Sequence, residues 1–257
     1  MDIASPIIVF CFISAIIYLI YRLRKRNNDL RLIRLVTPLN RGERSERSLV
    51  LTLLKSGINP KCIFHDLYLQ KPNGEYTQID VAVATKAGII VFEVKEYSGW
   101  IFGDEHQQYW TKIMKYGKDK YRFYNPVMQN SGHINVIRQS LPRNPEIPIY
   151  SVIVFYGDNE LKKVTCKAPD TYILQSRHIE YVVSEIMRRP PALYGDKYEI
   201  MNVFTAAVGN GNNPLIVSSQ IEAARYYGRD TPQPTHKGYL PRFFRFRGFR
   251  RRKRKFW

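Results

Sequence analysis

Two neighbouring runs of alternating polar and apolar residues, 76 to 84 and 89 to 97, most strongly constrain the fold of this 257-residue chain. Successive side chains of a strand point to opposite faces of a sheet, so each run predicts a β-strand with one buried face. The four residues between them, Thr85-Lys-Ala-Gly88, predict a tight connection and therefore a hairpin. We expect a sheet built around this hairpin at the centre of the fold.

One face of the predicted hairpin is polar. If the loop has four residues, Asp80 lies opposite Glu93 and Gln78 lies opposite Lys95, all on the same face. Two opposed carboxylates repel each other, and a divalent cation between them would remove that repulsion. Mg²⁺ (or Mn²⁺) suits such a site because it binds through one or two carboxylates and keeps waters. Lys95 would orient a water and offset charge on a phosphate. The alternative is a solvated face with an ordinary Glu–Lys ladder.

The other face of the hairpin is apolar and is expected to be core. It carries Ile79, Val81, Val83, Ile90, Phe92 and Val94. Further strands are predicted over 62–70, 151–156 and 171–174, with a short strand-like stretch at 99–109 and a basic, aromatic loop or strand at 116–124. Helices are predicted over 41–55, 127–141, 176–188, 198–207 and 219–227. This mixture of elements indicates an α/β fold.

The N-terminal segment predicts a membrane anchor. Residues 3 to 21 are apolar except for Ser5, Pro6 and Ser14. A helix of this length spans roughly 28 Å, close to the thickness of the hydrocarbon core. Four basic residues follow at once, namely Arg22, Arg24, Lys25 and Arg26. We therefore expect a transmembrane helix over residues 1–22 and a cytoplasmic C-terminal domain. The alternative is a buried core helix.

The net charge of +18 points to anionic partners, and most of the excess lies in two flanking runs, 22–34 and the tail after Arg242. The tail interleaves Phe with Arg, which suits nucleic-acid phosphates or an anionic membrane surface. Within the domain, the predicted nucleic-acid contacts are Lys112, Lys115, Lys118 and Arg122, interleaved with tyrosines. The alternative for this stretch is a solvated loop.

Two pairs of residues have open assignments. Trp100 and Trp110 would either stack on bases or be buried aromatics. Gln129 and His133 are four residues apart, so on a helix they share a face and are candidates for supporting the site. His133 is also a candidate phosphate contact or an ordinary structural histidine.

The ordered set of motifs resembles the nuclease-related domain family, NERD, within the PD-(D/E)xK nuclease superfamily. The matching residues are Gln78-Ile79-Asp80, the run from Gly88 to Lys95, Ser98-Gly99-Trp100-Ile101, Gly103, Trp110, Asn125-Pro126, Gln129, His133 and the helix from Ser45-Glu46-Arg47 to Leu54. The resemblance covers residues 41 to 141, and more loosely extends to 188. It implies a restriction-endonuclease-like mixed central sheet flanked by helices.

The resemblance also implies roles for individual residues. Asp80 and Glu93 would ligate the metal and Lys95 would position the nucleophilic water. Glu46 matches the family's helical acidic position, and is the third expected ligand, while Gln78 matches its Gln before the Asp. Ser45 departs from the Gly that the family usually has before this Glu. Because Glu43 also follows a Gly, it is a competing assignment.

The expected organisation has five parts: an anchor at 1–22, a basic linker at 23–40, a nuclease-like domain at 41–190, a helical or irregular extension at 191–240 and a basic aromatic tail at 241–257. The expected function is metal-dependent hydrolysis of DNA or RNA at the cytosolic face of a membrane, contacted by the anchor and the tail. The alternative is a non-catalytic, membrane-tethered module that binds nucleic acid or protein.

Overall fold

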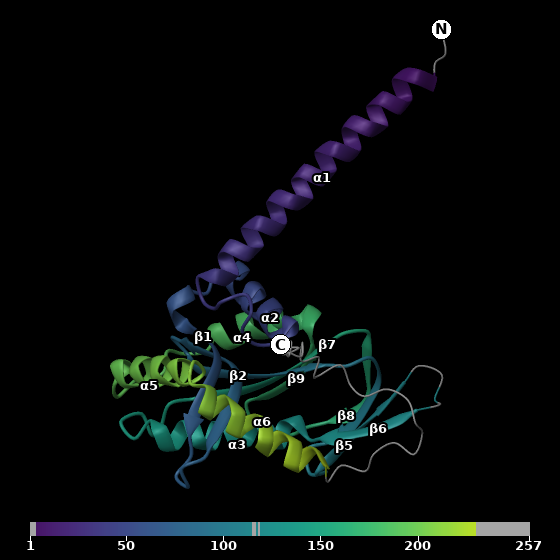
Figure 1. Ribbon diagram of the computed structural model, residues 1–257. Helices are drawn as coiled ribbons and strands as arrows, with labels where there is room; N and C mark the ends of the chain where they lie inside the picture. The colour runs from purple at the N-terminus through teal and green to yellow at the C-terminus, as the bar shows by residue number, and fades with distance from the viewer. Residues whose placement is uncertain (1–3, 115–116, 118, 230–257) are drawn as a thin grey trace, which may run out of the picture.

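A five-stranded mixed sheet forms the centre of the molecule (Figure 1). The computed structural model describes residues 4–114, 117 and 119–229. The sheet has the strand order β1-β2-β3-β7-β9, with antiparallel pairing from β1 to β3 and parallel pairing from β3 to β9. Its strands are β1 (Ile63–Gln70), β2 (Tyr76–Thr85), β3 (Gly88–Glu96), β7 (Ile149–Tyr156) and β9 (Thr171–Gln175). The predicted α/β fold with a mixed sheet and flanking helices is confirmed.

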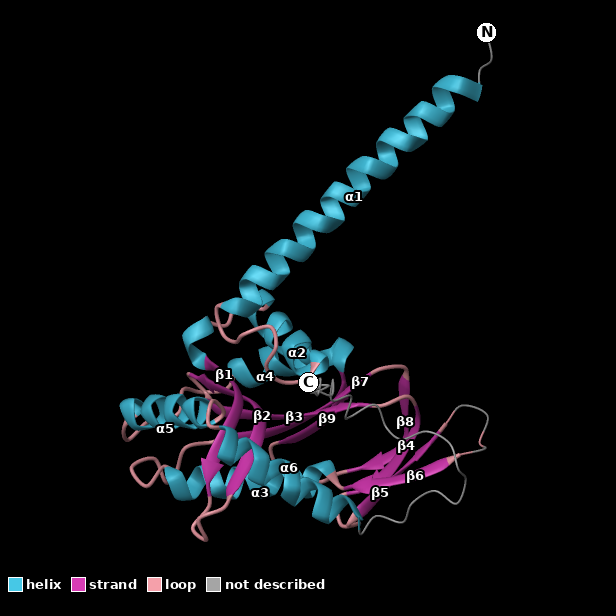
Figure 2. Ribbon diagram, viewed as in Figure 1, coloured by secondary structure: helices cyan, strands magenta, loops and turns pink. Residues whose placement is uncertain are grey.

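Helices cover both faces of this sheet (Figure 2). One face packs against α2 (Arg44–Lys55) and α4 (Ile179–Met187). The opposite face packs against α3 (Pro126–Ser140) and α5 (Lys197–Asn210). Short 3₁₀ turns, η1 (Pro60–Cys62) and η2 (Ser176–His178), precede β1 and α4. Two buried apolar layers therefore enclose the central strands, as mixed sheets with helices on both faces require.

A second, four-stranded sheet lies beside the first, with the order β6-β5-β4-β8. Its strands are β4 (Gly99–Asp104), β5 (Tyr109–Ile113), β6 (Lys120–Tyr124) and β8 (Asn159–Thr165). Fully buried Trp110 and Ile101 pack from this sheet onto Ile153 and Phe155 of β7. Trp110 is thus a core residue, whereas Trp100 is only partly buried. β8 was not predicted, and β5 was predicted only at its first residue, Tyr109.

The hairpin register is confirmed from Thr85–Gly88 to Val81–Phe92. The turn itself has only two unpaired residues, because Thr85 pairs with Gly88. Beyond Val81 the strands part: β2 continues along β1, while β3 follows β7 as far as Glu96. The predicted pairs of Asp80 with Glu93 and of Gln78 with Lys95 are therefore not formed.

A distortion at Asp66 explains this divergence. Asp66 in β1 has φ +58°, which is uncommon for a residue other than glycine, and it interrupts the β1–β2 ladder opposite Asp80. The alternation of faces changes there, because Val81 packs on the α2 side while Ile79 packs on the α3 side. The prediction of one apolar face holds for the other five residues and is wrong for Ile79.

The first helix corrects the N-terminal prediction. α1 (Ala4–Arg34) projects from the body as one long helix and includes most of the predicted linker. No helix in the described part of the chain is long and apolar enough to cross a membrane. The predicted single-pass anchor, and the localisation derived from it, are therefore wrong.

The C-terminal extension belongs to the domain. Ile200 and Phe204 of α5 are buried against β1, and Phe204 meets Phe64 edge-on with ring centroids 5.2 Å apart. α6 (Pro214–Arg229) follows, and its Gln220 amide donates a hydrogen bond to the Tyr76 carbonyl. Both predicted helices of this region are confirmed. The basic aromatic tail at 241–257 lies outside the described residues.

Candidate active site at the divergence of two strands

The candidate site begins where β2 leaves β3. With no backbone partner at this point, the Val94 N–H donates instead to Asp80 Oδ2 at 2.7 Å. The Asp80 side chain thus lies in the gap between the strands. Glu93 and Lys95 follow at alternate positions of β3, which places both on the face that packs against α3. The structure therefore brings three of the predicted residues, Asp80, Glu93 and Lys95, to one place.

Helix α3 supplies the neighbours of Glu93 and Lys95. Lys95 Nζ donates to Glu93 Oε1 and, at 3.0 Å, to Gln129 Oε1. His133, one turn further along α3, places Nε2 3.3 Å from Glu93 Oε2, and its Nδ1 is 2.9 Å from Thr77 Oγ1. The prediction that Gln129 and His133 share a face of the helix is confirmed, and both contact predicted site residues; their supporting role stays a prediction.

The ionisable side chains of this site affect one another's pKa values. Burial raises the pKa of Asp80 well above its ordinary value, and the negative charges of Glu93 and Glu46 raise it further. Burial also opposes ionisation of Glu93, but Lys95 and His133 outweigh it and lower the Glu93 pKa. Burial alone would lower the pKa of Lys95, yet Glu93 raises it overall. The site therefore combines an ionised Glu93, a charged Lys95 and an Asp80 that resists ionisation.

This pattern fits a hard cation held by two carboxylates. Glu93 Oε2 is buried without a hydrogen-bond partner, because His133 approaches it outside hydrogen-bond geometry. Ionised Asp80 is repelled by the neighbouring Glu93 carboxylate, and a bound cation would remove this repulsion. Mg²⁺ binds through one or two carboxylates and retains waters, so these two side chains meet its needs. However, no three His, Cys, Asp or Glu side chains of the described chain are close enough to hold a metal together, so Glu46 does not complete the predicted set.

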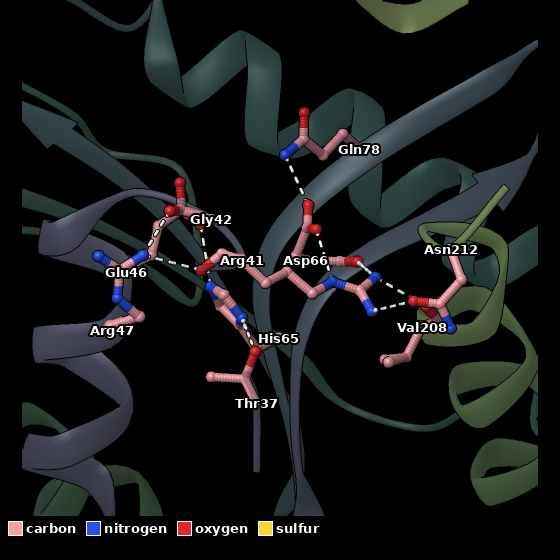
Figure 3. A network of polar contacts seen from close by, with 10 residues as sticks. All are labelled: Thr37, Arg41, Gly42, Glu46, Arg47, His65, Asp66, Gln78, Val208 and Asn212. Carbon is pink, nitrogen blue, oxygen red and sulfur yellow. Dashed lines mark hydrogen bonds and ion pairs between the residues drawn. The ribbon is translucent and has the colours of Figure 1, made fainter. Parts of the chain in front are cut away.

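Glu46 lies near the site but has a different partner. It is buried on α2, and its Oε2 is 3.0 Å from Nε2 of His65 in β1 (Figure 3). Its charge acts on Asp80, which places the two carboxylates within electrostatic range. The competing acid, Glu43, is exposed at the start of α2 and makes no side-chain cap. Of the two acids, Glu46 is the one that points into the domain.

Gln78 lies on the other side of the sheet from Glu93. Its amide donates to Asp66 Oδ1 at 2.7 Å, while Arg41 Nε holds Asp66 Oδ2 at 2.7 Å (Figure 3). The neighbouring Thr77 faces α3, so Gln78 points toward α2. The prediction that Gln78 shares a face with Glu93 and Lys95 is therefore wrong, because the distortion at Asp66 exchanges the two faces of β2.

The predicted nucleic-acid contacts separate into different environments. Lys112 is half-buried, with Nζ 4.5 Å from the ring centroid of Tyr97 and 5.2 Å from that of Tyr121. Arg122 pairs with Thr111, one position along, so it projects from the opposite face of the second sheet. His133 is buried behind Glu93 and not on that surface. Lys115 and Lys118 lie outside the described residues.

A groove of about 480 Å³ lies elsewhere, between β8 and β9. Lys162, Lys163 and Cys166 are among its lining residues, and none of the predicted site residues is. Its lining holds no carboxylate, so we do not place the reaction there.

Three residues that the sequence analysis did not single out complete the surroundings: His65, Asp66 and Arg41. The signal for the first two was a pair of polar residues inside an otherwise apolar strand. No local pattern marks Arg41, because its partners Asp66 and the Val208 carbonyl are far away in sequence.

Comparison with known proteins identifies the family of the chain. The family model described as nuclease-related domain, NERD, matches residues 41–156, which include every strand and helix that contributes Asp80, Glu93, Lys95 and their neighbours. The chain is also similar to an uncharacterized protein of Bacillus anthracis, with 31% identity over 158 residues, or 57% of this chain and 72% of the relative. No solved structure matches. The chain belongs to the NERD, or nuclease-related domain, family.

Proposed function

We propose that this protein is a metal-dependent nuclease that hydrolyses phosphodiester bonds of DNA or RNA at the Asp80–Glu93–Lys95 site. The observation that carries the proposal is the gap between β2 and β3. There, two carboxylates and a charged lysine meet in a chain of the nuclease-related family. Family membership alone suggests nuclease-related chemistry, and the side chains at this gap supply a reason for it.

Each residue has a defined task in this proposal. Asp80 and Glu93 would hold Mg²⁺ or Mn²⁺, which supplies Lewis-acid activation of water and of the phosphate when bound. Lys95 has three N–H donors, and Glu93 and Gln129 accept two of them. The third donor remains to bind a water or a phosphate oxygen. His133 and Gln129 hold Glu93 and Lys95 in place from α3.

Lys112 is the best placed cation for binding the substrate backbone. Tyr97, whose ring it covers, lies two residues after Lys95 and interacts electrostatically with it. Lys112 therefore lies on the side of the second sheet that borders the site, unlike Arg122. Burial lowers the Lys112 pKa, so its ammonium would gain from a phosphate partner.

The proposal predicts loss of cleavage with retention of the fold. The full-length chain with Mg²⁺ or Mn²⁺ should cleave labelled DNA or RNA, and Asp80→Asn, Glu93→Gln and Lys95→Met should each reduce the rate about 10²- to 10⁴-fold. Glu180→Gln, an exposed substitution on α4, is the matched control and should retain the rate. Because Asp80 is repelled by its neighbours, Asp80→Asn should not lower the unfolding temperature in the absence of metal.

Two results would overturn this function. Equal cleavage by the wild type and by all three variants would place the chemistry elsewhere. Tight, metal-independent binding of nucleic acid without cleavage would identify a binding module.

A separate prediction concerns substrate binding. Lys112→Gln should weaken binding of the nucleic acid. It should also reduce the slope of log K against the logarithm of the salt concentration by about the contribution of one phosphate contact. Arg122→Gln, which removes an equal charge from the opposite face, should change binding less. Equal effects measured by fluorescence anisotropy across a salt series would show that charge alone matters.

A further inference from the structure

His65 is a buried histidine that the proposed reaction does not use. It is 1% exposed and lies in β1 between Phe64 and Asp66. Both ring nitrogens have partners: Nδ1 is 2.9 Å from Thr37 Oγ1 and Nε2 is 3.0 Å from Glu46 Oε2 (Figure 3). The ring therefore bridges the segment before α2 to the acid that α2 directs toward the site.

The partners set the orientation of the ring. An ionised carboxylate only accepts hydrogen bonds, so Nε2 donates to Glu46. In the neutral ring Nδ1 then accepts, and the Thr37 hydroxyl donates to it. Thr37, His65 and Glu46 are all at least nine-tenths buried, so water cannot easily replace either bond.

The space around this bridge is already filled. A Cβ at Gly42 would lie 2.4 Å from Glu46 Oε2 and 2.5 Å from the His65 ring. Arg47 fixes the same loop by donating to the carbonyls of Gly42 and Arg41, at 2.5 and 2.9 Å. Glutamate side chains are flexible, but the loop at Gly42 and the His65 ring pack closely against the Glu46 carboxylate and restrict its movement.

We propose that His65 is a positioning residue that holds the Glu46 carboxylate at the Asp80 end of the site, and that Thr37 fixes the ring in turn. The inference rests on the proposed function, because Glu46 matters only if the Asp80–Glu93 pair binds a cation. His65 pairs across the sheet with Val81, the residue next to Asp80, and its bond to Glu46 therefore keeps this carboxylate near Asp80. Glu46 is not part of a three-residue ligand cluster in the described chain. When a cation is bound, the Glu46 oxygens would accept hydrogen bonds from the waters that it keeps, because residues behind the direct ligands commonly orient the ligands of metal sites.

Two substitutions at one position separate positioning from packing. In His65→Gln the amide reaches the place of Nε2 and keeps the bond to Glu46. In His65→Asn the shorter amide reaches the place of Nδ1 and keeps only the bond to Thr37. Both remove a similar ring volume from the core. We expect His65→Asn to weaken Mn²⁺ binding about 10- to 100-fold and His65→Gln to stay within about 3-fold of the wild type.

Calorimetry with MnCl₂ on the full-length chain measures this difference, and the Mg²⁺ concentration at half-maximal cleavage provides a second readout. Thr37→Val, which keeps the shape but removes the hydroxyl, should weaken Mn²⁺ binding several-fold, and Thr37→Ser should restore it. This pair tests the bridge even if a His65 variant does not fold.

The outcomes distinguish the two proposals. If the wild type binds Mn²⁺ and cleaves while His65→Asn and His65→Gln behave alike, or Thr37→Val binds Mn²⁺ like the wild type, the positioning role is overturned and the function stands. If the wild type binds no Mn²⁺, both proposals are overturned. A selective loss in His65→Asn, with unfolding temperatures similar in the two variants, supports the positioning role.

Discussion

Asp80 takes the place of a backbone group in the sheet. Its Oδ2 accepts the Val94 N–H that β2 would otherwise bind, so the side chain stabilises the point at which the strands part. The other carboxylate oxygen remains for a different partner. Asp80 therefore has a structural role and a proposed chemical role. These two roles explain why a carboxylate suits the gap although Glu93 and Glu46 repel its negative charge.

At the residue scale, Gly42 and Gly57 provide a matched test of crowding. Both have positive φ, +64° and +85°, but a Cβ meets Glu46 and His65 only at Gly42. Gly57→Ala should lower the free energy of unfolding by about 1 to 2 kcal/mol through backbone strain alone. Gly42→Ala should cost about 1 to 3 kcal/mol more, because the added methyl overpacks the bridge.

Urea denaturation of the two variants measures this difference. Equal losses would show that Glu46 and His65 move aside at little cost, and that their positions are not fixed as the inference requires.

Sequence reasoning reached Asp80, Glu93 and Lys95 because strand alternation and family motifs are local. It misplaced Gln78 because the distortion lies at Asp66 on another strand, β1. That distortion interrupts the β1–β2 pairing and changes which side chains of β2 point to each face of the sheet. The register itself was predictable as far as the distortion.

At the scale of elements, α3 is oriented by the residue that caps it, Asn125. Asn125 is fully buried and caps the helix by accepting from the Val127 and Met128 N–H groups. Its amide also donates to three carbonyls at the end of β4 and in the loop that follows, those of Asp104, Glu105 and Gln107. The cap therefore ties α3, which carries Gln129 and His133, to the second sheet.

Asn125→Ala should lower the free energy of unfolding by about 2 to 4 kcal/mol. A lost cap accounts for about 1 kcal/mol, and buried carbonyls without a partner account for the rest. Asp196 also caps a helix, α5, but is more exposed, so Asp196→Ala should cost only about 1 kcal/mol. Similar losses in guanidinium titrations would show that the amide's three bonds contribute little.

β8 illustrates an element that the sequence hides. Its seven residues, Asn159–Thr165, are largely polar and mostly not buried, and they pair with β4 on one side. Strands that contribute little to the core lack a clear apolar alternation. β7 was the opposite case, because both its faces are buried and its apolar run is continuous.

At the scale of the molecule, the segment after residue 190 is part of the same cooperative unit. Phe204→Ala should lower the free energy of unfolding of the whole domain by about 3 to 5 kcal/mol, because it removes a fully buried ring next to Phe64. Tyr198→Ala, at an 81% exposed position of the same helix, should change it by less than about 0.5 kcal/mol.

Thermal unfolding followed by tryptophan fluorescence reports on the second sheet, where Trp100 and Trp110 lie. A Phe204→Ala variant whose second sheet melts like that of the wild type would show that α5 is a separate attachment.

The base of α1 is clamped to the domain, because Asp29 pairs with Lys55 of α2 at 2.7 Å and Ile33 is buried. From Asp29 to Ile8 the helix extends about 30 Å at its ordinary rise. The helix is therefore a rigid spacer of constant length. A label on the exposed Cys11 would lie at a nearly constant distance from the nuclease-related domain. Any molecule that binds the exposed apolar side chains around Cys11 would be held at the same distance.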